Sequence, residues 1–159
     1  MIATLNRLES KTVWSQLPGA TAAIQALNKI SEQSTMEPNL IELVNLRCSQ
    51  LNGCAYCVQY HTGNLTAAGE LAHRITLLPV WPEAGCYTDR EMAAFAWAEA
   101  VTRLSETHAP DDVWERARAV FNDEELAALT LAVATINIWN RMSVPFRFPP
   151  ELPDQTFPG

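Results

Sequence analysis

Two cysteines and a histidine of this chain are spaced for thiol chemistry. Cys54 and Cys57 form a C-x-x-C motif, and His61 follows Cys57 by four residues. On a helix these three side chains share one face, because positions three and four residues apart are about one turn apart. The positive end of a helix stabilises a thiolate at its N-terminus, and an imidazole one turn away can accept the thiol proton. A second thiol within a turn can resolve a sulfenic acid before it oxidises further, so the spacing predicts a reactive dithiol.

Other interpretations of the cysteine pair remain open at this stage. A C-x-x-C can be half of a structural zinc site, but a second ligand pair at the spacing of a zinc finger is missing, since Cys48 and Cys86 are isolated. A catalytic zinc with an open position has no support in the sequence. The pair could also be two core cysteines placed together by chance, an interpretation that His61 weakens. We therefore expect no metal and no cofactor.

A glutamate twelve residues before Cys54 is the fourth candidate. Glu42 lies in a predicted helix that is apolar over more than half of its circumference, and it shares the remaining narrow stripe with Asn45 and Ser49. This stripe either faces solvent, as isolated glutamates usually do, or faces His61 if the next helix folds back. In the second case the carboxylate would fix the imidazole tautomer and raise its basicity. The periodicity does not decide between the two.

The elements that must position these residues are helical. No stretch of the sequence shows sustained period-two alternation with β-branched enrichment, so the predicted class is all-α, with about six to seven helices. Two pairs with capping-box spacing, Thr88 with Glu91 and Asn122 with Glu125, start long helices. The predicted helices cover residues 21–34, 38–52, 54–69, 71–77, 88–105, 110–122 and 122–141, and Pro79 and Pro82 are expected to end the fourth of them.

The two ends of the chain differ from its helical middle. Five of the ten prolines fall in the last fifteen residues, which cannot form a helix. Three phenylalanines in this segment, Phe146, Phe148 and Phe157, indicate that it packs on the body of the protein or on a neighbouring subunit. The sequence therefore divides into an N-terminal arm (1–19), a helical domain (20–142) and a proline-rich tail (143–159).

Composition excludes several classes of protein. A chain of 159 residues with 48% hydrophobic residues can build one core, and no unbroken apolar run approaches the length of a transmembrane helix. The net charge of −7, with only two lysines, leaves no basic surface for nucleic acid. No secretory segment is evident at the start of the sequence. We expect a cytoplasmic protein without nucleic-acid or membrane partners, whose cysteines do not form a structural disulfide framework.

The four candidates also resemble a known motif. A glutamate, eleven residues, Cys-x-x-Cys, three residues and a histidine are the signature of the AhpD-like alkylhydroperoxidase core, within the carboxymuconolactone decarboxylase superfamily. Glu42, Cys54, Cys57 and His61 match this signature without a gap. The resemblance covers residues 20–105 and extends to the last predicted helix. It implies an AhpD-like helical fold with the C-x-x-C at the start of a central helix.

The resemblance implies a thiol-dependent peroxidase. In the family the second cysteine is peroxidatic and the first resolves it, which maps to Cys57 and Cys54, while Glu42 and His61 would relay the proton. The substrate would be hydrogen peroxide or an organic hydroperoxide, and an unknown thiol or protein electron donor would restore the dithiol. The best-known peroxidase of the family has a histidine between its cysteines, where this chain has Tyr56, a poor base near neutral pH. The decarboxylase branch lacks the C-x-x-C, which argues against lactone decarboxylation.

Some expectations concern the assembly and the remaining residues. Proteins of the resembling family form oligomers, and the wide apolar surface of the helix over 38–52 agrees with burial against several neighbours, so we expect a homo-oligomer, a hexamer or a trimer. A general thiol–disulfide oxidoreductase and a redox-sensing stress protein without turnover remain alternative functions. Cys48 is interpreted as an inert core thiol, Cys86 receives no role, and Asn137 and Asn140 are interpreted as structural amides.

Overall fold

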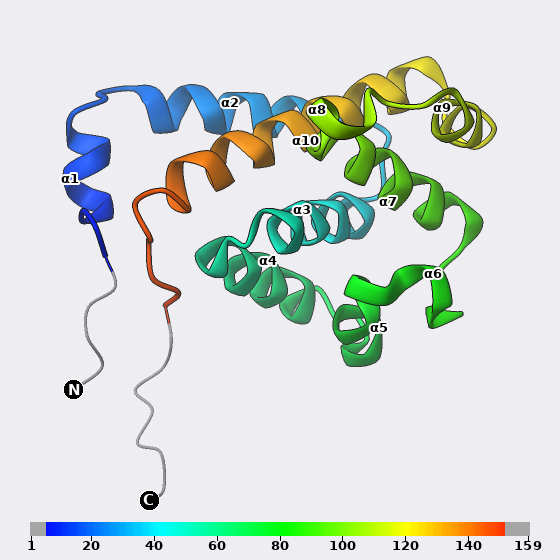
Figure 1. The fold of residues 1–159 in the computed structure, drawn as a ribbon, viewed down its shortest axis with the longest axis horizontal. Helices are drawn as coiled ribbons and strands as arrows, with labels where there is room; N and C mark the ends of the chain where they lie inside the picture. The colour runs from blue at the N-terminus through cyan, green and yellow to red at the C-terminus, as the bar shows by residue number, and fades with distance from the viewer. Residues whose placement is uncertain (1–5, 152–159) are drawn as a thin grey trace, which may run out of the picture.

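The computed structural model describes residues 6–151, and this part of the chain is all-α (Figure 1). It contains ten α-helices and one 3-10 helix, and no strand is present between residues 6 and 151. The helix count exceeds the six to seven expected because several additional helices are only one or two turns long. In chain order the elements are α1 (Ser10–Ser15), α2 (Ala20–Glu32), α3 (Pro38–Asn52), α4 (Ala55–Ala67), α5 (Ala72–Leu77), η1 (Leu78–Val80), α6 (Trp81–Ala84), α7 (Asp89–Thr102), α8 (Leu104–Thr107), α9 (Asp111–Arg118) and α10 (Asp123–Ser143).

The long helices begin where their start signals predict. Pro38 occupies the first turn of α3, where a missing backbone N–H costs nothing. Both expected capping boxes form: the side chain of Thr88 accepts from the backbone N–H of Glu91, and that of Asn122 accepts from the N–H of Glu125. In each box the glutamate carboxylate accepts in return from the N-cap backbone. These signals therefore locate α3, α7 and α10 correctly.

The short helices correct the sequence-based boundaries. Helix α1 lies inside the segment predicted to be an arm, and no side-chain cap marks its start. Pro79 and Pro82 follow the end of α5, as expected, but each also lies in the first turn of a further short helix, η1 and α6. The predicted helix over 88–105 is interrupted at Arg103, whose backbone is not helical, so that α8 is separate from α7.

Helix α3 lies at the centre of the fold. It contacts α4, α7 and α10, and α2 packs along α10 on the outer side (Figure 1). Leu43, Val44 and Leu46 of α3 are completely buried, together with Phe95 of α7 and Leu129 of α10. The wide apolar surface of α3, on which the expected oligomer partly rested, is thus covered by helices of the same chain. The homo-oligomer stays a prediction.

The C-terminal segment folds back on the helical body. Phe148 is buried, and the ring of Phe146 stacks on it at 5.9 Å between centroids. The backbone N–H of Arg7 donates to the carbonyl of Phe146 at 3.0 Å, which joins the two ends of the described chain. Packing on the body is therefore confirmed for this part of the tail, whereas Phe157 lies outside the described residues. Among the helices between residues 6 and 151, none is both long and apolar enough to cross a membrane.

Candidate active site

The turn between α3 and α4 places the first cysteine. Gly53 adopts a left-handed conformation with φ of 68°, which a glycine reaches without strain. The N–H of Gly53 donates to the carbonyl of Gln50 at 3.2 Å, and the N–H of Cys54 donates to that of Ser49 at 3.0 Å. These two bonds form a Schellman motif that ends α3. The residue after its glycine, Cys54, becomes the N-cap of α4 rather than a residue within the helix.

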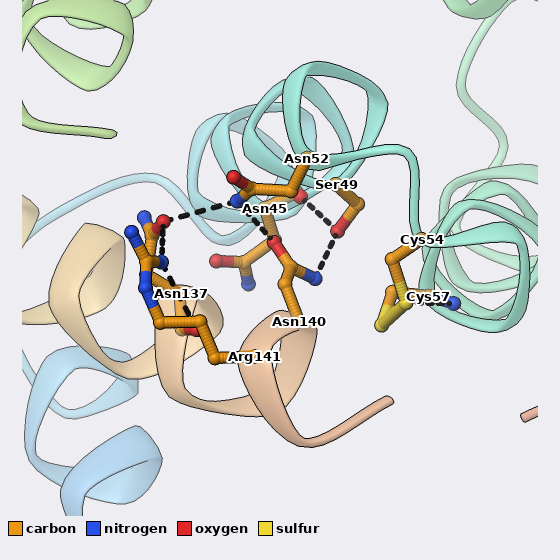
Figure 2. Close-up of a disulfide and its surroundings, with 8 residues drawn as sticks. All are labelled: Asn45, Ser49, Asn52, Cys54, Cys57, Asn137, Asn140 and Arg141. Carbon is orange, nitrogen blue, oxygen red and sulfur yellow. Dashed lines mark hydrogen bonds between the residues drawn. A yellow bond between two sulfur atoms is a disulfide. The ribbon is translucent and has the colours of Figure 1, made fainter. Parts of the chain in front are cut away.

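The two cysteines of the motif are bonded to each other. Cys54 and Cys57 form a disulfide, with their Cα atoms 5.3 Å apart (Figure 2). As N-cap, the Cys54 sulfur also accepts the backbone N–H of Cys57 at 3.2 Å. A sulfur in this position faces the positive end of the helix dipole, which stabilises negative charge on it. Cys54 is 2% exposed and Cys57 is 4% exposed.

The structure brings Glu42 to His61. The Nδ1 atom of His61 lies 2.9 Å from Oε2 of Glu42, and the side-chain amide of Asn64 donates to the same oxygen at 3.2 Å. The polar stripe of α3 therefore faces α4 at this position, which decides the choice that periodicity leaves open. A carboxylate only accepts hydrogen bonds, so Nδ1 is the donor of this contact, and Nε2 is the atom that can accept a proton when the ring is neutral. His61 is buried, and the Glu42 side chain is one-quarter exposed.

A pocket of about 380 Å³ opens beside the cysteine pair. Cys57 and His61 line it, but Cys54 does not. The other residues of its wall include Tyr56 and Tyr60 of α4, Asn45 of α3, and Ile136 and Trp139 of α10. A small organic molecule fits a cavity of this size. A reagent that enters it therefore contacts Cys57 and His61 but not Cys54.

Helix α2 supplies the part of this pocket that the sequence analysis missed. Gln25, Asn28 and Lys29 line it. They lie next to the apolar positions Ile24 and Leu27, so a polar edge along an amphipathic helix is the only signal that could have indicated them. Ile24 of α2 is buried, whereas Ile30 is largely exposed.

Two tyrosines form the aromatic side of the pocket. The rings of Tyr56 and Tyr60 stack with centroids 6.5 Å apart, and Tyr60 meets the ring of His61 edge-on at 5.2 Å. Burial, with smaller effects from the nearby Glu151 and Tyr60, raises the pKa of Tyr56 above its usual value. Tyr56 is therefore a neutral phenol near neutral pH and can donate a hydrogen bond at the position where the resembling peroxidase has a histidine.

A buried network of amides holds the end of α3 against α10 (Figure 2). The amide of Asn52 donates to Asn137 Oδ1 at 3.0 Å and to Asn140 Oδ1 at 2.8 Å. Asn140 in turn donates to the hydroxyl of Ser49 at 3.1 Å, and Asn137 donates to Thr102 at 3.0 Å. The structural interpretation of Asn137 and Asn140 is confirmed. The backbone carbonyl of Ser49 accepts the N–H of Cys54. The network therefore supports the turn that positions the cysteine pair.

The remaining cysteines lie apart from this site. Cys48 is completely buried and accepts a hydrogen bond from Thr102 at 3.3 Å. Burial raises the pKa of the Cys48 thiol to about 12, so the thiolate does not form near neutral pH. Cys86 is a free thiol of intermediate exposure. Within residues 6–151, no group of three or more histidine, cysteine or acidic side chains is arranged to hold a metal ion.

Comparison with known proteins places the chain in a family. Residues 13–100 match the model of the carboxymuconolactone decarboxylase family. The chain is 33% identical to the uncharacterized protein YdfG of Bacillus subtilis (strain 168) over 127 residues, which are 80% of this chain and 86% of that protein.

Solved structures share the fold. A protein of unknown function from Agrobacterium tumefaciens, described as a candidate antioxidant defence protein AhpD, is 38% identical and superimposes with a TM-score of 0.87 over 93% of this chain and 99% of its own. The debrominase Bmp8 has a TM-score of 0.77 at 18% identity, over 86% of this chain and 74% of its own. The chain therefore belongs to the carboxymuconolactone decarboxylase family, and its helical domain has the AhpD-like fold.

Proposed function

We propose that the protein is a thiol-dependent peroxidase that reduces hydrogen peroxide or organic hydroperoxides. One observation carries the proposal: the pocket beside the cysteine pair reaches Cys57 and His61 together, and Glu42 binds the far side of that imidazole. A nucleophile, its base and the group that orients the base are the three parts that thiol catalysis needs.

The oxidative half of the cycle begins at Cys57. Nε2 of His61 takes the thiol proton, and the thiolate attacks one oxygen of the peroxide. The O–O bond breaks, Cys57 becomes a sulfenic acid, and the departing hydroxide or alkoxide receives the proton from His61. Glu42 stabilises the imidazolium between these two steps and keeps its tautomer fixed.

Cys54 then completes the oxidative half of the cycle by forming the disulfide. Its thiol attacks the sulfur of the Cys57 sulfenic acid, an S–S bond forms, and the hydroxyl group leaves as water. The Cys54–Cys57 disulfide of the structure corresponds to the product of this step. Two electrons have passed from the two thiols to the peroxide, and a thiol donor must return them. No metal or cofactor enters the cycle.

The test compares three activities of the same preparation. Dithiothreitol serves as donor, and consumption of hydrogen peroxide and of cumene hydroperoxide is measured beside reduction of a disulfide such as oxidised glutathione. Peroxide turnover that exceeds disulfide reduction, and that is lost in Cys57→Ser, is the expected result. Faster reduction of the disulfide would instead indicate a general thiol–disulfide oxidoreductase. A change of oligomeric state on oxidation, without turnover, would indicate a redox sensor.

A fourth assay tests for debromination. Bmp8 is a debrominase that has been crystallised with 2,3,4-tribromopyrrole, and the aromatic wall of the pocket here would accept a small ring. Likeness of fold at this level of identity does not carry the activity over. Bromide release from this compound is therefore measured alongside peroxide consumption, and release that exceeds peroxide turnover would replace the peroxidase proposal.

A further inference from the structure

We infer that the thiol donor attacks the sulfur of Cys57, not that of Cys54, when the disulfide is reduced, and that it does so through the same pocket that the peroxide uses. The inference rests on the proposed function, because it concerns the return of the oxidised site to its dithiol. It assigns opposite roles to two sulfurs that are chemically equivalent in a symmetric disulfide.

The two cysteines differ in their access to the pocket. Both sulfurs belong to almost fully buried residues, with 2% of Cys54 and 4% of Cys57 exposed, so a donor thiolate needs a cavity to approach either one. The pocket of about 380 Å³ is lined by Cys57 and not by Cys54. Cys54 lies at the turn between α3 and α4 (Figure 2), where its backbone N–H donates to the carbonyl of Ser49. Of the two cysteines, the one that a reagent in the pocket contacts is therefore Cys57.

The two sulfurs also differ as leaving groups. Thiol–disulfide exchange is faster when the departing sulfur is stabilised as a thiolate. The Cys54 sulfur accepts the N–H of Cys57 at 3.2 Å at the N-terminus of the thirteen-residue helix α4, so negative charge that develops on it is stabilised. Attack on Cys57 expels this sulfur, whereas attack on Cys54 would expel Cys57. Access and the stability of the leaving thiolate therefore both favour attack on the Cys57 sulfur.

The exchange takes place in two steps. The donor thiolate forms a bond to the Cys57 sulfur, the Cys54–Cys57 bond breaks, and its electron pair leaves with Cys54 as a thiolate. A second donor thiol attacks the donor sulfur of this mixed disulfide, so that the donor disulfide forms and Cys57 leaves as a thiolate. Two thiols are thereby oxidised to one disulfide, and the protein disulfide is reduced. Peroxide and donor must then occupy the pocket in turn.

The primary experiment locates the adduct. The disulfide form, prepared with diamide so that no peroxide activity is required, is treated with excess 2-mercaptoethanol, quenched in acid and blocked with N-ethylmaleimide. Peptide mass spectrometry is expected to find mercaptoethanol on Cys57 and maleimide on Cys54. A mercaptoethanol adduct that is mainly on Cys54 overturns the inference.

A pair of variants tests whether the donor thiol reaches the disulfide through the pocket. This test does not require a mixed disulfide to accumulate. Gln25 lines the pocket from α2, whereas Gln33 is exposed at the end of the same helix and does not line it. Gln25→Trp is expected to slow reduction of the disulfide by 2-mercaptoethanol about tenfold by restricting access to the sulfur, and Gln33→Trp is expected to leave it unchanged. A reduction rate that Gln25→Trp does not lower overturns the shared entry.

The outcomes separate the inference from the function on which it rests. If peroxide does not oxidise the dithiol, the proposed function fails, yet an adduct on Cys57 and slower reduction in Gln25→Trp still support the inference. If peroxide is turned over but the adduct forms on Cys54, the inference fails and the peroxidase stands.

Discussion

The Nδ1 atom of His61 lies 2.9 Å from the carboxylate of Glu42, so two residues nineteen positions apart on adjacent helices form one unit beside the cysteine pair. The distance is short enough for a direct hydrogen bond. It leaves the other ring nitrogen as the acceptor on the imidazole. The contact therefore links the charge of a carboxylate that is only one-quarter exposed to the base that the proposed reaction needs.

Replacing this carboxylate by an amide tests the link. In Glu42→Gln the negative charge is lost and the amide can donate to Nδ1, which favours the wrong tautomer, so the rate of peroxide oxidation is expected to fall by about a hundredfold. Stopped-flow tryptophan fluorescence of the reduced protein measures this rate. The matched control is Glu115→Gln on the exposed surface of α9, which should keep the wild-type rate. A wild-type rate in Glu42→Gln would contradict a role of Glu42 in proton transfer through His61.

The buried thiol of Cys48 is expected to stay unmodified in the native protein. Its pKa of about 12 leaves almost no thiolate at about pH 8, and its side chain is inaccessible. Iodoacetamide labelling of the reduced protein, followed by peptide mass spectrometry, should therefore modify Cys57 well before Cys48. In guanidinium chloride all four cysteines should react. Labelling of native Cys48 as fast as Cys57 would contradict the buried position.

Two glycines offer a matched pair of substitutions near the site. Gly53 has a φ of 68° and Gly63 lies within α4, and an added Cβ would meet no atom within 4 Å at either position. Gly53→Ala should lower the free energy of unfolding by about 1–2 kcal/mol, because only the left-handed backbone opposes it. Gly63→Ala should raise it by up to about 1 kcal/mol through helix propensity. Urea unfolding of the disulfide forms measures both, and shifts of the same sign would contradict the described turn.

Much of the fold could be predicted from local signals. Pro38 and the glycine after Asn52 mark α3 at both ends, and the two capping boxes mark α7 and α10. Helix α1 has no such signal, since Glu9 caps it without a side-chain hydrogen bond. Pro79 and Pro82 follow the end of α5 as expected, but they also lie in the first turns of η1 and α6, because proline is excluded from a helix interior and favoured in its first turn.

The site was predictable to a smaller extent. The arrangement of Cys54, Cys57 and His61 depends on a single helix, so their spacing predicts it. The one difference is that Cys54 is the N-cap of α4 and not a residue within the helix. The direction in which Glu42 points depends on how α4 packs against α3, which the periodicity of either helix does not contain. The pocket wall from α2 depends on packing between distant segments and was missed for the same reason.

Thiol stoichiometry tests the central claim most directly. The reduced protein is mixed with one equivalent of hydrogen peroxide, and free thiols are counted after a rapid acid quench. The account predicts loss of two of the four thiols in the wild type, loss of one in Cys54→Ser as a sulfenic acid that dimedone traps, and no loss in Cys57→Ser. No loss of thiols over minutes in the wild type, or a loss that Cys57→Ser does not prevent, would contradict it.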